Sequence, residues 1–254
     1  MSKTHLVNLT EEERNVILGT LLGDGSISLS GPNQTSARIR IQQSLSQKRL
    51  VKWKYERLKR LVGTRPRVVS NGGYGKLLCA FSTLSFPELK DIYEMTHVGT
   101  KKAITTQWLE SISHPIALAV WYMDDGSQGR SAMFIHTEGY SQKENKMLSA
   151  WLTDRWNIEN KIISVGKYWR LQFPATGRDF FQDLIREYVI PEMSYKILPK
   201  MENVYCTMCG KRFQLERGQI LKNRLVVLCG SKDCSTRWVR MSSKIRAYYH
   251  RAAI

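Results

Sequence analysis

The chain is poor in acidic residues, because 22 Asp and Glu stand against 39 Lys and Arg in 254 residues. The resulting formal net charge of +17 favours a polyanionic partner, either nucleic acid or an anionic membrane surface. The chain also lacks any apolar run near the roughly 20 residues that cross a bilayer. Its start carries three consecutive glutamates, residues 11 to 13, where a signal peptide needs an apolar stretch.

These absences exclude membrane-spanning and secreted proteins, and 42% hydrophobic residues can fill a core. We expect no membrane partner and a location in a bacterial or phage-infected cytoplasm or in an organellar matrix. Five cysteines are an odd number, and four of them lie near the C-terminus, which indicates a metal site in a reducing compartment rather than a disulfide framework. Cys79 alternates with Leu77 and Phe81 and is expected to be a small buried hydrophobe.

Two segments of the chain repeat each other. Residues 17–25 and 118–126 are both apolar, both are expected to be helical, and both end in Asp-Gly; the repeated acids, Asp24 and Asp125, are 101 residues apart. The same series follows each copy: two strands, an amphipathic helix, two strands and a helix. In the first half we expect strands at 25–30, 36–43, 65–70 and 74–83 and helices at 47–62 and 86–96. In the second half we expect hairpins of two strands at 127–137 and 162–173 and helices at 143–156 and 178–189.

Small residues suggest how the two apolar helices meet. Gly19 and Gly23 are four residues apart on one helix face, which allows a second backbone to approach closely. We expect the partner to be the repeated helix. Ala119 and Val120 are larger than the glycines, so the packing is expected to depart from perfect symmetry.

The negative charges of the acids at the helix ends require a nearby positive charge. A carboxylate at a helix C-terminus faces the negative pole of the helix dipole. A divalent cation held by that carboxylate and by unpaired terminal carbonyls would supply the positive charge, and Gly25 and Gly126 are typical helix-ending residues. If the helices pack face to face, Asp24 and Asp125 lie side by side and repel each other without a metal.

The paired segments, above all Trp121-Tyr122-Met123-Asp124-Asp125-Gly126, resemble the two-motif, single-chain LAGLIDADG homing endonucleases. The likeness covers residues 10–199 and includes the phrase from Met193 to Pro199. It implies an α/β (α+β) fold in which two pseudo-symmetric αββαββα halves form a saddle of antiparallel sheets. The protein would then be a monomer whose two halves are arranged like the subunits of a dimer, an internal pseudo-dimer. The last acid of each motif, Asp24 and Asp125, would bind Mg²⁺ or Mn²⁺. Asp124 occurs only in the second copy and is expected either to lie at the interface between the halves or to support the metal ligands without binding the metal itself.

Members of this family also place a lysine near each metal. Lys196 ends the second half and Lys102 occupies the corresponding place after the first, so both are candidate catalytic residues. Lys101 is an alternative to Lys102, because sequence alone does not separate neighbours. A single lysine in so basic a chain is otherwise a solvated surface group.

Alternating strand residues predict a DNA-reading surface. From residue 36, one strand face is polar and the other is apolar. Arg and Gln match guanine and adenine edges, and a β-ribbon can present them in the major groove. The candidates are Ser36, Arg38, Arg40, Gln42, Arg65, Arg67, Lys76, Arg170 and Gln172. The basic residues of the helix near 48–60, Lys54 among them, are expected to form a solvated outer face.

The C-terminal segment forms a separate module. Cys206-x₂-Cys209 and Cys229-x₄-Cys234 are close to zinc-ribbon spacing, so four thiolates are expected to bind a structural Zn²⁺. Residues 200–254 hold twelve Lys and Arg against three acids, a net charge of +9. Arg237, Arg240 and Lys244 are interleaved with aromatic residues, a pattern that suits phosphate contact. The expected domains are 1–104, 105–199 and 200–254.

We therefore predict a metal-dependent endonuclease that cuts both strands of double-stranded DNA at a long, asymmetric site. The alternative is a non-cleaving binder of the same fold, either a maturase acting on its own intron RNA or a DNA-binding regulator. Loss of a motif acid would favour the binder, but both acids are present. The initiator Met and the absence of a terminal His-Asn favour a free-standing or intron-encoded protein over an intein.

Overall fold

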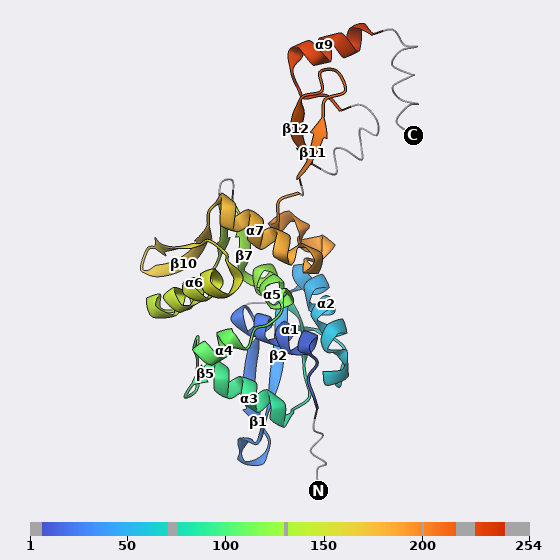
Figure 1. Cartoon of the computed structure of the whole chain (residues 1–254). Coiled ribbons are helices and arrows are strands. Elements are labelled where there is room, and N and C mark those ends of the chain that lie inside the picture. Colours follow the sequence, from blue (N-terminus) through green and yellow to red (C-terminus); the bar gives the residue numbers. More distant parts are fainter. Residues whose placement is uncertain (1–6, 71–75, 130–131, 200, 217–226, 242–254) are drawn as a thin grey trace. The chain divides into compact units, whose positions relative to one another are not determined.

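A computed structural model gives the structure of the protein and describes residues 7–70, 76–129, 132–199, 201–216 and 227–241 (Figure 1). The chain separates into two compact units, residues 1–197 and 198–254. In the described parts, no helix is long and apolar enough to cross a membrane.

The first unit contains the repeat that the sequence predicts. One copy runs α1 (Glu11–Leu22), β1 (Ser26–Ser30), β2 (Ser36–Ser44), α2 (Lys48–Leu58), β3 (Arg67–Ser70), β4 (Leu77–Ser82) and α3 (Pro87–Thr96). The other runs α5 (Pro115–Asp125), β7 (Gly126–Gln128), β8 (Met133–Ile135), α6 (Gln142–Trp156), β9 (Lys161–Val165), β10 (Tyr168–Phe173) and α7 (Ala175–Ile185). The αββαββα order is confirmed in both copies. A hairpin of β5 (His97–Val98) and β6 (Lys101–Lys102) and the short α4 (Thr106–Glu110) join them.

Each copy builds one antiparallel sheet. The strand orders are β1-β2-β4-β3 and β7-β8-β10-β9, so the two sheets have the same topology. Helices α2 and α3 pack on the first sheet and α6 and α7 on the second. The alternating apolar residues of the strands, such as Ile39, Ile41 and Leu171, lie under these helices and form the core.

Local sequence explains where several elements begin. Helix α1 starts with a capping box, in which the Thr10 hydroxyl accepts from the Glu13 amide and the Glu13 carboxylate accepts from the Thr10 amide. Strand β3 begins at Arg67 and not at residue 65, since Pro66 has no amide hydrogen for a sheet ladder. Part of the predicted strand 74–83 lies outside the described residues; β4 begins at Leu77.

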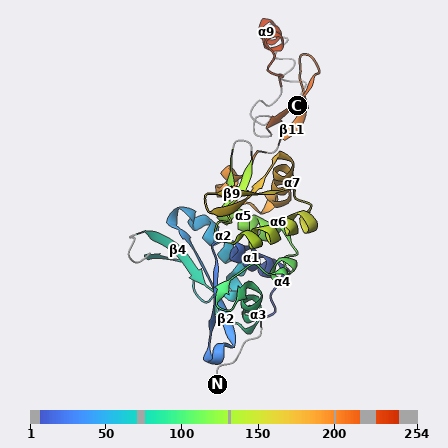
Figure 2. The same cartoon turned by 90° about the vertical axis from the view of Figure 1, so that its left-hand side faces the viewer.

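The two motif helices, α1 and α5, pack directly against each other at the centre of this unit (Figures 1 and 2). A Cβ atom on Gly19 would lie 2.3 Å from the carbonyl oxygen of Ala117, so only glycine allows this approach. A Cβ atom on Gly23 would lie 2.7 Å from the Asp124 carboxylate. The predicted glycine contact between the repeats is confirmed, and the unequal residues opposite the glycines make it asymmetric.

Candidate active site

The ends of α1 and α5 bring three carboxylates together. Asp24 follows α1 and is exposed, Asp125 is the last residue of α5 and is half-buried, and Asp124 is buried. The glycine after each motif acid is required by space, not by a left-handed backbone. A Cβ on Gly25 would lie 2.5 Å from Thr20, and one on Gly126 would lie 2.0 Å from the Tyr122 ring.

Electrostatics at the helix ends disfavour three free negative charges. Burial raises the pKa of Asp125 to about 7, and the carboxylates of Asp24 and Asp124 add to this rise. The ammonium groups of Lys102 and Lys196 oppose it. Carboxylates that lie this close together ionise more readily when a cation is bound between them. The arrangement therefore fits a divalent cation, which would stabilise both motif acids in the ionised form.

Both lysines predicted from the repeat reach the ends of the motif helices. Lys102 Nζ donates to the carbonyls of Leu21 (2.8 Å) and Gly23 (3.2 Å). Lys196 Nζ donates to the carbonyls of Met123 (2.6 Å) and Asp124 (3.2 Å). These backbone carbonyls therefore accept hydrogen bonds from lysine, whereas the sequence had suggested that carbonyls at the helix ends bind the cation. Lys101, the alternative, is exposed.

Burial lowers the pKa of both Lys102 and Lys196, while the neighbouring carboxylates oppose this effect. Each ammonium group is thus held beside the acids in a partly dry environment. The two halves supply equivalent lysines, one per helix end, as the repeat predicts.

Two residues of the site were missed by sequence reasoning. Gln43 Nε2 donates to Asp24 Oδ2 at 2.9 Å and to Asp124 Oδ1 at 3.0 Å. Lys54 Nζ lies 2.7 Å from both carboxylate oxygens of Asp124. The expectation that Lys54 belongs to a solvated face was wrong, because its side chain is completely buried.

The sequence holds a signal for each. Gln43 continues the inward face of β2 after Ile39 and Ile41, so it is a polar residue in a core position. Lys54 lies one helical turn from both Leu50 and Leu58, in the middle of the buried stripe of α2.

The outward face of the first sheet carries the predicted polar row. Arg38, Arg40 and Gln42 are exposed and Ser36 is half-buried, while the residues between them are buried. Arg40 Nε donates to Gln42 Oε1 at 3.0 Å, so these two side chains already lie together. Arg67 pairs with Ala80, which is itself opposite Gln42, and therefore lies on the same face. Lys76 is exposed directly before β4.

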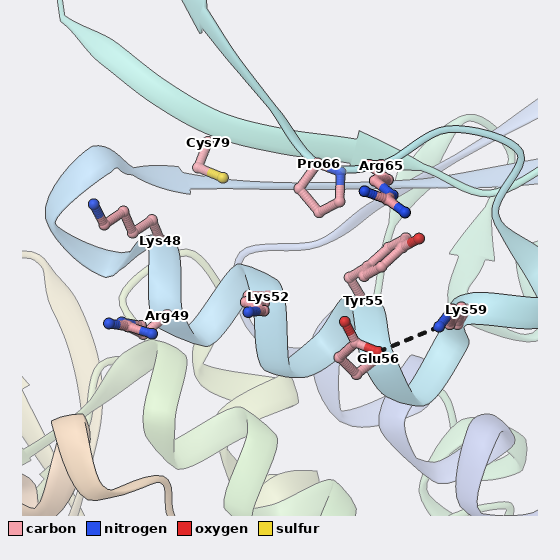
Figure 3. Close-up of a pocket in the computed structure, with 9 residues that line it drawn as sticks. All are labelled: Lys48, Arg49, Lys52, Tyr55, Glu56, Lys59, Arg65, Pro66 and Cys79. Carbon is pink, nitrogen blue, oxygen red and sulfur yellow. Dashed lines mark ion pairs between the residues drawn. The ribbon is translucent and has the colours of Figure 1, made fainter.

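Arg65 does not join this row. It precedes β3 and lines a pocket with Cys79 and the basic side of α2 (Figure 3). Cys79 alternates with Ala80 along β4, so this pocket is on the helix-covered side of the sheet. The expected alternation of Arg65 with Arg67 was wrong because the strand starts after Pro66.

In the second sheet the predicted residues lie on one strand, β10. Arg170 is in an ion pair with Glu138, with Nε 2.6 Å from the carboxylate, so its guanidinium is engaged within the protein. Gln172 is half-buried and pairs with Phe134 on β8.

The second unit gathers the four C-terminal cysteines. It contains β11 (Met201–Tyr205), β12 (Arg212–Glu216) and α9 (Lys232–Arg240). The Sγ atoms of Cys206, Cys209, Cys229 and Cys234 all lie within 4.8 Å of one another. Adjacent Sγ distances of 4.0 Å (Cys209 to Cys229) and 3.7 Å (Cys229 to Cys234) are close to the about 3.8 Å expected around tetrahedral zinc.

Backbone amides support a thiolate in this cluster. Burial raises the pKa of Cys206, but amides of Met208, Cys209 and Cys229 that donate to its sulfur lower it to about 6. The donor set therefore fits a zinc ion. Arg237 and Arg240 are exposed on α9, and Lys244 lies outside the described residues.

Comparison with known proteins agrees with this fold. The family model described as the LAGLIDADG DNA endonuclease family matches residues 14–181, and the chain belongs to that family. It is 34% identical over 124 residues to the "Probable intron-encoded DNA endonuclease 3" of Mycosarcoma maydis, covering 48% of this chain and 91% of that protein.

Two further similarities extend over most of the first unit. Protein RecA of Mycobacterium shimoidei is 29% identical over 208 residues, which cover 76% of this chain and 48% of that protein. The chain thus spans about half the length of that RecA protein. The solved structure of the homing endonuclease I-WcaI bound to its DNA recognition sequence has the same fold, with a TM-score of 0.68 at 20% identity, over 76% of this chain and 88% of that one.

Proposed function

We propose that this protein is a site-specific endonuclease that cuts both strands of double-stranded DNA and uses Mg²⁺ or Mn²⁺. The observation that carries the proposal is the pair of acids, Asp24 and Asp125, at the ends of two packed motif helices, each accompanied by a lysine. Family membership supports it.

Asp24 and Asp125 would hold the divalent cations. When bound, such cations supply an activated water, stabilise charge on the phosphoryl oxygens and assist the leaving 3′ oxygen. Lys102 and Lys196 fix the helix ends on which the acids stand. Their ammonium groups also place positive charge beside the position of the scissile phosphates, which favours the more negative transition state.

The first sheet would position the duplex. Arg38, Arg40, Gln42 and Arg67 share one outward face whose opposite face is buried under helices. Since Arg and Gln recognise guanine and adenine edges, this face is the proposed base-reading surface. Ser36 and Lys76 lie at its margins. The two halves carry different side chains, so the target is expected to be asymmetric.

The second unit would bind Zn²⁺ through its four cysteines and add phosphate contacts from exposed Arg237 and Arg240. A segment of this size buries little apolar surface, so the metal is expected to contribute much of its folding free energy.

The test is to incubate the purified protein with Mg²⁺ and a randomised duplex library and to sequence the cut ends. A shared, asymmetric sequence with cuts in both strands is the expected result. Intact duplexes together with tight binding of structured intron RNA would replace the endonuclease by the maturase alternative.

A further inference from the structure

A buried ion pair joins the two halves behind the motif acids. Lys54 on α2 and Asp124 on α5 are 70 residues apart in sequence, and both side chains are completely buried. Removing two charges from water is unfavourable, and replacing such a pair by apolar residues is often neutral or stabilising. The pair is therefore poorly explained by stability alone.

Gln43 connects this pair to a motif acid. Its amide nitrogen donates to Asp124 Oδ1 and to Asp24 Oδ2. Asp124 Oδ1 accepts from both Lys54 Nζ and Gln43 Nε2, so Gln43 presents its NH₂ group, and not its oxygen, to the acids. Lys54 Nζ contacts both oxygens of Asp124 at 2.7 Å and thereby fixes the orientation of the carboxylate that Gln43 contacts. The series Lys54, Asp124, Gln43 thus determines which group faces Asp24.

The second half has no matching connection among its described residues. Ser26 pairs with Arg40 in the first sheet, and the equivalent residue Ser127 pairs with Phe134 in the second. By this register, Thr137 occupies the position that corresponds to Gln43. Thr137 Oγ1 donates to Asn145 at 2.6 Å, so its hydroxyl hydrogen is directed to that side chain and not to a motif acid.

We propose that Lys54 and Asp124 are positioning residues that act through the hydrogen bonds of Gln43 on Asp24, a connection that Asp125 lacks among the described residues, so that they set the relative rates at which the two DNA strands are cut. The proposal rests on the proposed endonuclease function. It predicts that loss of the pair slows one strand cut selectively.

The decisive variant is the double replacement Lys54→Met/Asp124→Leu. Leucine has the same branching and the same number of side-chain heavy atoms as aspartate, and the double replacement leaves no unpaired buried charge. The matched control is Glu13→Gln/Arg60→Met, which removes another ion pair between α1 and the segment that follows α2, with a 2.6 Å contact away from the acids. A single variant, Gln43→Met, interrupts the connection and leaves the ion pair in place.

The assay uses a target duplex, obtained from the library experiment, with a different label on each strand. Single-turnover rates of both cuts and affinity without divalent cation are measured. In the double variant and in Gln43→Met, the ratio of the two strand rates should change about 10-fold to 100-fold, with affinity retained, because supporting partners of metal ligands typically have effects of this size. The control should keep the wild-type ratio.

Equal slowing of both cuts in the double variant would overturn the proposal, since a lower folded fraction scales both rates together. The proposal is also overturned if the double variant folds and keeps the wild-type ratio while Gln43→Met changes it, because Gln43 would then act independently of the ion pair. If the double variant does not fold, Gln43→Met with a wild-type ratio rejects the proposal, and a changed ratio supports action through Gln43. Failure of the proposed function is distinct, because the wild-type protein would then cut neither strand.

Discussion

Gly19 of α1 faces the backbone of Ala117 of α5 so closely that a Cβ atom would lie 2.3 Å from the Ala117 carbonyl oxygen. Alanine at this position improves helix propensity, but it must push two packed helices apart. We expect Gly19→Ala to reduce the free energy of unfolding by about 1 to 3 kcal/mol, the usual range for overpacking. Urea unfolding measures the effect. Gly139→Ala is the control, because nothing lies within 4 Å of a Cβ there, and a comparable destabilisation in the control would reject the explanation.

The motif acids should be separable from DNA binding. Asp24→Asn and Asp125→Asn are expected to retain specific affinity and to lower double-strand cleavage by about 100-fold or more, because they bind metal and not bases. Lys102→Met and Lys196→Met should slow cleavage less. Strand-resolved cleavage and filter binding on the same duplex measure both quantities. Full cutting by either acid variant would refute the assignment of the site.

Metal analysis should find about one zinc per chain, since four thiolates complete one tetrahedral site. Cys206→Ser and Cys209→Ser should each lower the zinc content and destabilise the second unit. Cys79→Ser provides the control, because Cys79 is buried in the first unit and is not part of the cluster. Iron in place of zinc, or an intramolecular disulfide, would contradict this prediction.

Truncation after Pro199 removes residues 200–254, which are nearly all of the second unit and carry a net charge of +9. For every phosphate that the second unit neutralises, its removal should lower the slope of log affinity against log salt by about 0.9 on duplex DNA. The truncated protein should bind more weakly, show a shallower salt dependence and cut the same bonds at high protein concentration. Titrations at several salt concentrations test this, and an unchanged slope would point to a protein-binding role for the second unit.

Acid stability should depend on Glu13. Burial raises the pKa of Glu13, but the hydrogen bonds from Arg60 and Thr10 outweigh burial, so the pKa lies below its ordinary 4.5. Because folding lowers its pKa, Glu13 stabilises the folded protein at pH values above its pKa in the unfolded chain. This stabilisation is lost as the pH falls through the pKa of Glu13 in the folded protein. Glu13→Gln should therefore destabilise the protein at neutral pH and flatten its stability profile below about pH 4.5. Denaturant midpoints across this range are the measurement. Exposed Glu110→Gln should keep the wild-type profile.

The repeat and its fold were predictable because apolar periodicity and the paired Asp-Gly endings are local features. The acids and lysines were identified from equivalent positions in the two copies together with the family resemblance, which implied their roles. Lys54 and Gln43 were not identified, since their meaning depends on Asp124, which lies 70 and 81 residues away in sequence. Charge alone suggested solvent for Lys54, whereas its place between Leu50 and Leu58 indicated burial. Arg65 was misplaced because a proline moved the start of its strand.

The close approach of Gly23 to Asp124 also determines which halves can pair with each other. Two first halves placed together would set glycine against glycine and leave a void at the helix crossing. Two second halves would set carboxylate against carboxylate in an apolar crossing without Lys54, which is an unfavourable arrangement. Each half is therefore the complement of the other, and neither motif helix is suited to pack against a copy of itself. If the gene were divided between the copies, its two polypeptides should recombine as a mixed pair and not as homodimers.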